Sequence, residues 1–310
     1  MFNGCDNGVS TKILLKAQKQ SVRHIHFDQL SLFNGLHCAS IFVIDEIVVS
    51  SVVEDCGIKQ KNCMTHTPLG WAAGNGHEGV VRVLLSRDDI APGKPGEDGQ
   101  TPLCLAAHKG REEVVKILLG RSDVDPDKPG KVGETPLLQA AYNGCGGVVK
   151  MLLERVDVDP DKSDERGETP LLQAASNGYE GVVEMLLGRD DVNPNKTNEY
   201  GETPLLRAAF YGREGVVKIF LGRDDVNPDK SDNDDQTPLL LAASNGHEGV
   251  VKLLLAHEVN PDKPDRWGRT PLSWAVENCH VRVMALLQHP ISATPALPKT
   301  GEASPPRTPH

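Results

Sequence analysis

The stretch TPLLLAASNGHEGVVKLLL, residues 237–255, decides the fold, because it is one copy of a unit that fills most of the chain. Thr is a preferred N-cap residue, and Pro suits the first helical position, where its missing N–H costs nothing. Leu239, Ala242 and Ala243 follow at the i, i+3 and i+4 spacing, which predicts one apolar helix face. Gly246 is expected to end this helix in the left-handed conformation.

The second half of the unit predicts a second helix. Glu248 lies in its first turn, where a negative charge is favourable against the helix dipole. A second apolar stripe follows, formed by Val250, Val251, Leu254 and Leu255. An Asn-Pro-Asp sequence then breaks this helix and starts a polar loop.

The unit recurs at an almost constant spacing. Thr-Pro-Leu occurs seven times, every 34 residues except for a last spacing of 33, with its threonines at Thr67, Thr101, Thr135, Thr169, Thr203, Thr237 and Thr270. A helix pair of this length cannot bury its apolar face alone and is stable only when stacked on its neighbours. The sequence therefore predicts one cooperative all-α solenoid.

The boundaries of the array follow from where the motif fades. A degenerate copy at 35–49 extends the array to residues 34–290, about eight repeats. Residues 1–33 are interpreted as an N-terminal segment, in which 10–22 are a candidate capping helix. Residues 291–310 are rich in Pro and are expected to be a disordered tail.

Composition narrows the classes of partner and compartment. The net charge is −10 and no run of four Lys or Arg occurs, which argues against direct binding of nucleic acid and favours basic partners. The chain has seven cysteines, an odd number, and no C-x-x-C motif. This pattern fits reduced thiols in an intracellular compartment, cytoplasm or nucleus. No secretory signal and no apolar stretch long enough to span a membrane is recognised. We expect a monomer without membrane association.

The repeated unit resembles the ankyrin repeat, whose signature is Thr-Pro-Leu-His-x-Ala-Ala, a Gly, and then Val-Val-x-Leu-Leu. The resemblance covers roughly residues 34–290 and implies an ankyrin-repeat solenoid of helix–loop–helix units with short β-turn loops. It also implies a non-catalytic scaffold or regulator that binds another protein through its concave face. Long arrays of this kind in filamentous fungi are similar, which leaves two alternatives: a sensor fragment of an NTPase-bearing receptor, or a transcriptional co-regulator linked to a secondary-metabolite gene cluster.

One departure from the family signature concerns packing. In the family, the signature His bonds between neighbouring repeats, and here only His37 keeps it. Its place in the seven main repeats is taken by Gly70, Cys104, Leu138, Leu172, Leu206, Leu240 and Ser273. We therefore expect an array held more by apolar contact.

Catalytic and metal-binding motifs are not complete. His77 and His247 begin like H-E-x-x-H, but a Val stands where the second His should be, and no phosphate-binding loop occurs. No enzyme activity, cofactor or metal site is predicted. Asp123, Asp125, Asp127 and, further on, Glu134 match the spacing of calcium ligands in an EF-hand, although Lys replaces the required Gly. A calcium-responsive protein remains the third alternative.

Five aromatic residues fall on positions that the resemblance places on the partner-binding surface. Counted from each Thr, these positions lie three residues before it and seven and eight after it, and they hold Tyr142, Tyr200, Phe210, Tyr211 and Trp267. Because Tyr and Trp anchor many interfaces, we predict a binding hot spot centred on Tyr200, Phe210 and Tyr211 and flanked by the other two. The alternative is that aromatic residues occupy tolerant surface positions without function. Trp71, Phe220 and Trp274 lie at inward positions and are expected in the core.

One repeat is expected to be locally soft. Gly146 stands where most other repeats carry Glu in the second helix. It removes a partner of the helix dipole and adds backbone entropy, about 1 kcal/mol together.

Overall fold

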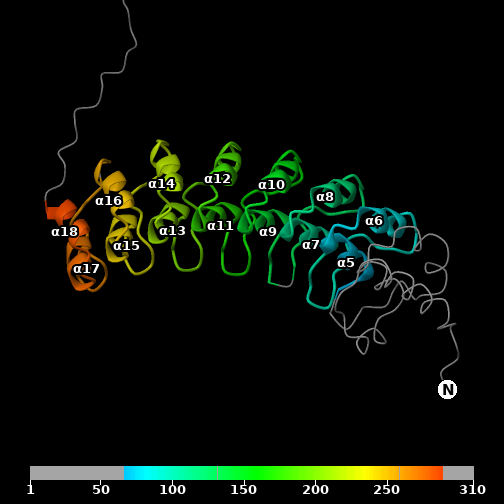
Figure 1. The fold of residues 1–310 in the computed structure, drawn as a ribbon, viewed down its shortest axis with the longest axis horizontal. Coiled ribbons are helices and arrows are strands. Elements are labelled where there is room, and N and C mark those ends of the chain that lie inside the picture. The colour runs from blue at the N-terminus through cyan, green and yellow to red at the C-terminus, as the bar shows by residue number, and fades with distance from the viewer. Residues whose placement is uncertain (1–65, 131, 258, 289–310) are drawn as a thin grey trace, which may run out of the picture.

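A computed structural model of the protein describes residues 66–130, 132–257 and 259–288. These residues form fourteen α-helices arranged as seven antiparallel pairs (Figure 1). The predicted degenerate N-terminal repeat, the candidate capping helix and the Pro-rich tail lie outside the described residues.

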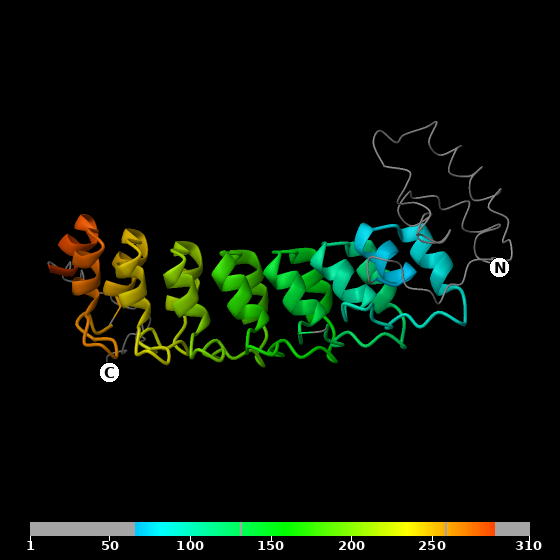
Figure 2. The same cartoon turned by 90° about the horizontal axis from the view of Figure 1, so that it is seen from below.

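Each pair consists of a first helix and a second helix. The first helices are α5 (Pro68–Asn75), α7 (Pro102–His108), α9 (Pro136–Tyr142), α11 (Pro170–Asn177), α13 (Pro204–Phe210), α15 (Pro238–Ser244) and α17 (Pro271–Glu277). The second helices are α6 (Glu78–Leu85), α8 (Glu112–Leu119), α10 (Gly146–Leu153), α12 (Glu180–Leu187), α14 (Glu214–Leu221), α16 (Glu248–Leu255) and α18 (Val281–Gln288). The array is curved, with the first helices and the loops along its inner, concave side (Figure 1). The loops run side by side along one edge (Figure 2).

The predicted helix boundaries are confirmed in the described repeats. Every Thr of the motif accepts a hydrogen bond at its side-chain oxygen from the backbone N–H three residues later, at 3.0–3.3 Å. Gly246 has a φ of 73°, in the left-handed region that Gly adopts without a Cβ clash. In the last repeat Cys279 stands at the same place with a φ of 59°.

A large apolar core runs along the array from Leu69 to Val283, and Leu206, Leu240 and Leu241 form a second, smaller cluster. The predicted stripes are buried, apart from Leu255, which is half-buried. The residues that replace the signature His are also buried, except for Ser273, which is exposed. Phe220 is fully buried, as predicted. Trp71 and Trp274, which were also expected in the core, are only half-buried, and Trp274 packs against the smaller cluster. Trp274 belongs to the last described repeat, so no further described repeat covers it.

Polar contacts between repeats accompany the apolar core. Four arginines after the second helices donate to a leucine carbonyl of the preceding repeat at 2.9–3.3 Å: Arg121, Arg155, Arg189 and Arg223. Each also holds the Asp two residues later through two hydrogen bonds of 2.6–2.9 Å. We call these four residues the arginine ladder. The sequence led us to expect an array held more by apolar contact. The structure adds this second, polar set of contacts between repeats.

Each of the fourteen described helices has seven or eight residues. Within 66–288, apart from the two positions that are not described, no helix combines the length and the apolar character that crossing a bilayer requires.

Candidate partner-binding hollow

A hollow of about 670 Å³ opens on the concave side, across the repeats that begin at Thr135, Thr169 and Thr203. First helices α9, α11 and α13 and the loops before them supply most of its walls. Its lining comprises Val132, Glu134, Tyr142, Asp164, Glu165, Arg166, Glu168, Gln173, Ser176, Asn177, Tyr200, Arg207, Tyr211 and Arg213. The lining thus combines aromatic, acidic and basic side chains.

Three of the five predicted binding residues meet in this hollow. Tyr142 is the last residue of α9, Tyr200 lies in the loop before α13, and Tyr211 caps the end of α13. Their exposed fractions are 49%, 56% and 41%. Tyr200 and Tyr211 lie 58 and 69 positions after Tyr142 in the sequence, and the stacking of the repeats brings all three to the same hollow. Three of the four tyrosines of the chain therefore line it.

The other two predicted residues are exposed but do not line the hollow. Phe210 packs edge-on against Tyr211, with the ring centroids 4.9 Å apart. Trp267 lies in a separate cluster, where the guanidinium groups of Arg266 and Arg269 stand 5.5 and 4.9 Å from its ring centroid. The five residues therefore form a tyrosine hollow with an adjoining Phe, and a distinct Trp–Arg cluster near the C-terminal end of the array.

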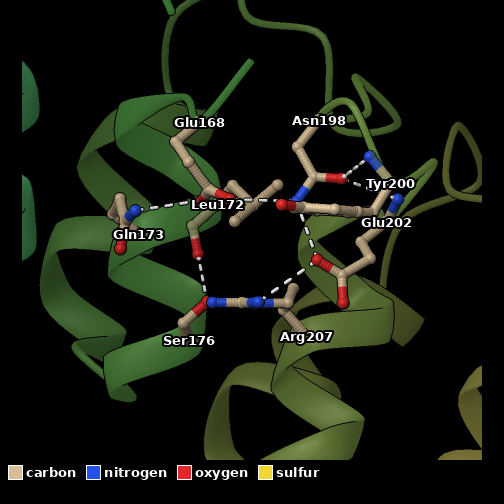
Figure 3. A network of polar contacts seen from close by, with 8 residues as sticks. All are labelled: Glu168, Leu172, Gln173, Ser176, Asn198, Tyr200, Glu202 and Arg207. Atoms are coloured by element: carbon tan, nitrogen blue, oxygen red, sulfur yellow. Dashed lines mark hydrogen bonds and ion pairs between the residues drawn. The ribbon is translucent and has the colours of Figure 1, made fainter. Parts of the chain in front are cut away.

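The floor of the hollow is a polar network that sequence reasoning missed (Figure 3). Glu168 is buried and accepts hydrogen bonds from the side-chain amides of Gln173, at 3.0 Å, and Asn198, at 2.9 Å. Asn198 also donates to Glu202 at 2.7 Å and, through its Oδ1, fixes the backbone of the loop that carries Tyr200. Through Asn198, Glu168 of one repeat therefore helps to position the Tyr200 loop of the next repeat, which forms part of the wall of the hollow.

Arg207 closes the other side of the network. Its guanidinium donates to Glu202 and to the Ser176 hydroxyl, both at 3.1 Å, and lies 5.3 Å from the ring centroid of Tyr211. Ser176 lies seven residues after Thr169, a position that the family resemblance places on the partner-binding surface, but it is only 5% exposed and donates to the carbonyl of Leu172. Its burial follows from the long side chain of the next repeat that covers it.

The electrostatics of the floor are set by burial. Burial raises the pKa of Glu168, while the hydrogen bond from Asn198 and the charge of Arg207 act in the opposite direction. On a neighbouring part of the lining, Oε2 of Glu134 is buried and accepts no hydrogen bond from the described residues. Both residues occupy the position just before the motif Thr, and their acidity there was a signal in the sequence that could have indicated the floor.

The carboxylates with EF-hand spacing point in different directions. Asp123 is held by Arg121, Asp127 accepts from the backbone N–H of Asp159 in the next repeat, and Glu134 lines the hollow. Among the residues that the structure describes, no group of three or more His, Cys, Asp or Glu is gathered for a metal ion.

Comparison with protein families gives a match over most of the chain. The family described as ankyrin repeats in three copies matches residues 36–129, 88–164, 137–232 and 217–295, which overlap and together run from 36 to 295. A comparison with curated proteins gave no match.

Proposed function

The chain belongs to the ankyrin-repeat family, whose members are in general protein–protein interaction modules, and on that premise we propose that it is a non-catalytic scaffold or regulator that binds another protein in its tyrosine hollow. The observation that supports this most is the convergence of Tyr142, Tyr200 and Tyr211 in one hollow of the concave face. Aromatic residues are only 4% of the chain, so three exposed rings in one place stand out.

The physical basis is the contact area that these side chains offer. Tyr supplies a large, rigid apolar surface with a polar tip and loses little conformational entropy on binding, which is why it is enriched among the residues that dominate interface energies. A hollow of about 670 Å³ can enclose one or two side chains of a partner, with the loops around it forming a polar rim.

The experiment is affinity capture from native lysate with quantitative mass spectrometry. The wild-type chain is compared with a variant carrying Tyr142→Ala, Tyr200→Ala and Tyr211→Ala, and with a control variant, Val156→Ala, at an exposed apolar residue outside the hollow. We expect a protein that wild type and control retain and the triple variant loses. Equal capture by all three would contradict the assignment of the hollow. A third variant, Phe210→Ala with Trp267→Ala, tests the two predicted residues outside the hollow.

A further inference from the structure

We propose that the tyrosine hollow takes a basic segment of the partner protein, with one Lys or Arg side chain whose cation is bound by Glu134 and Glu168. This inference rests on the proposed function and specifies the chemistry of what is bound. It follows from the charges that remain uncompensated in the lining, from an unbonded carboxylate oxygen, and from the aromatic walls.

The acidic and basic side chains of the lining are not equally engaged. Of the three arginines in the lining, Arg207 is paired with Glu202 and Arg213 donates to the carbonyl of Ser176 at 2.9 Å. The third, Arg166, follows Asp164 and Glu165 in the sequence, so the lining holds four acidic side chains against three basic ones. Glu168, by contrast, takes its two side-chain hydrogen bonds from the neutral amides of Gln173 and Asn198. A carboxylate in a half-enclosed space gains most from a cationic partner, since such hydrogen bonds are stronger than neutral ones.

Glu134 adds an oxygen that needs a donor. Its Oε2 is buried and has no hydrogen-bond partner among the described residues. Buried polar atoms in proteins are nearly always hydrogen-bonded, because an unbonded one forfeits its interaction with water. Because Glu134 lines the hollow, a turn of its side chain would present this oxygen to an ammonium or guanidinium group there, which would supply the donor. Asp164 and Glu165 extend the acidic character to the rim.

The tyrosines suit the rest of a basic side chain. Lys and Arg carry long apolar stems that pack on aromatic rings, while the ring faces attract the cation itself. The chain already shows this pairing in the hollow, where Arg207 and Arg213 stand 5.3 and 5.9 Å from the ring centroid of Tyr211. Tyr142 and Tyr200, about half exposed, offer the same kind of surface to a side chain of the partner.

The test is an unbiased selection of peptides from a phage-displayed random library on the full chain, with elution by excess protein. We expect the enriched peptides to share a Lys or Arg at one fixed position. A selected peptide, labelled with fluorescein, is then titrated with wild type and with the double variant Glu134→Gln and Glu168→Gln. Gln is the residue that the chain itself carries at this position in two other repeats, at Gln100 and Gln236, so folding should be preserved.

The expected result is a loss of affinity of roughly tenfold in the double variant. The same loss is expected when the fixed basic residue of the peptide is replaced by Gln. The control variant Glu154→Gln and Glu184→Gln removes the same charge from two exposed positions, the C-cap of α10 and the middle of α12, and should bind as wild type does. Thermal unfolding followed by circular dichroism verifies that all variants are folded.

Two results would overturn the inference, and they are distinguishable from each other. Peptides that bind through the tyrosines but carry no fixed basic residue, or bind the Gln variant equally well, would contradict the basic ligand while leaving the proposed function intact. A selection without any peptide that depends on Tyr142, Tyr200 and Tyr211 would contradict both.

Discussion

Three loop aspartates, Asp127, Asp161 and Asp229, each bury one carboxylate oxygen that receives no hydrogen bond from the described residues. The other oxygen of Asp161 accepts from the backbone N–H of Asn193 in the next repeat at 2.8 Å. Asn195 occupies the equivalent position one repeat later, and its Nδ2 donates to the carbonyl of Asp225 at 2.6 Å. An amide therefore satisfies a position where a carboxylate leaves one oxygen unbonded.

We predict that Asp161→Asn stabilises the protein by about 1 kcal/mol near neutral pH, because the new amide can donate to the carbonyl of Asp191, the counterpart of Asp225. The reverse change, Asn195→Asp, should destabilise it by a similar amount. Urea unfolding followed by circular dichroism measures both. If both variants had the same free energy of unfolding as wild type, the unbonded carboxylate oxygen would carry no cost in stability.

The gain from Asp161→Asn should depend on pH. Burial raises the pKa of Asp161 in the folded chain, and this effect outweighs the opposing hydrogen bond from Asn193. Its contribution to stability is therefore most favourable below its unfolded pKa, about 4, and is lost as the pH rises through the folded pKa. Since Asn does not titrate, the difference between variant and wild type should be larger at about pH 7 than at about pH 4. A difference independent of pH would contradict the raised pKa.

At the scale of the element, α10 differs from the other interior second helices because it has no acidic residue in its first turn. In neighbouring repeats the first-turn Glu lies over a Gly of the following second helix: Glu112 over Gly147 and Glu180 over Gly215. Gly146 has no side chain to fill the corresponding space, and a Cβ built on Gly181 meets nothing within 4 Å. The predicted soft repeat therefore coincides with an unfilled place between α10 and α12.

We predict that Gly146→Glu stabilises the protein by about 1 kcal/mol, because it restores the charge at the helix N-terminus and lowers the entropy of the unfolded chain. A Cβ at this position has its nearest neighbour at 3.4 Å, in the methyl group of Met185, so it fits. In the wild type, hydrogen exchange should be faster in α10 than in α8 or α12. Protection of α10 equal to that of its neighbours would refute the soft repeat.

A double-mutant cycle tests the geometry of this space. Gly181→Ala alone should stabilise by up to about 1 kcal/mol, since Ala is the better helix former and meets nothing. Combined with Gly146→Glu, the gain should fall short of the sum, because the new Glu carboxylate and the Ala methyl group compete for one place. Gly215→Ala is the matched control in a filled position, where the Glu180 carboxylate must move, and should gain less. Strict additivity would contradict the competition.

At the scale of the whole molecule, the array behaves as a row of repeats whose stability is a sum of internal and nearest-neighbour terms. The apolar core supplies one nearest-neighbour term and the arginine ladder supplies another. Arg155 illustrates the geometry, since its guanidinium holds Asp157 with two nitrogens and the carbonyl of Leu119 in the preceding repeat with the third. Lys cannot form this fork, because its ammonium is a single point charge.

We predict that replacing the four residues of the arginine ladder by Lys weakens coupling between repeats by up to about 1 kcal/mol per interface. Urea unfolding should then shift to lower concentration and broaden, with a smaller apparent m-value as end repeats unfold separately. The control exchanges four exposed lysines on second helices for Arg, at Lys116, Lys150, Lys218 and Lys252. A transition as sharp as that of wild type would show that apolar contact alone couples the repeats.

The sequence by itself determined the helix pairs, their boundaries and the positions of the exposed aromatic side chains. It could do so because capping, helix termination and apolar periodicity depend on residues only a few positions apart, and because the motif recurs seven times in register. Only the tertiary structure decided which aromatic residues share one hollow, that Ser176 is buried, and that Glu168 in the lining is bonded to Asn198 of the next repeat. These contacts join residues about 30 positions apart through the curvature and stacking of the repeats, and pairing over that distance leaves no periodic trace in a single sequence.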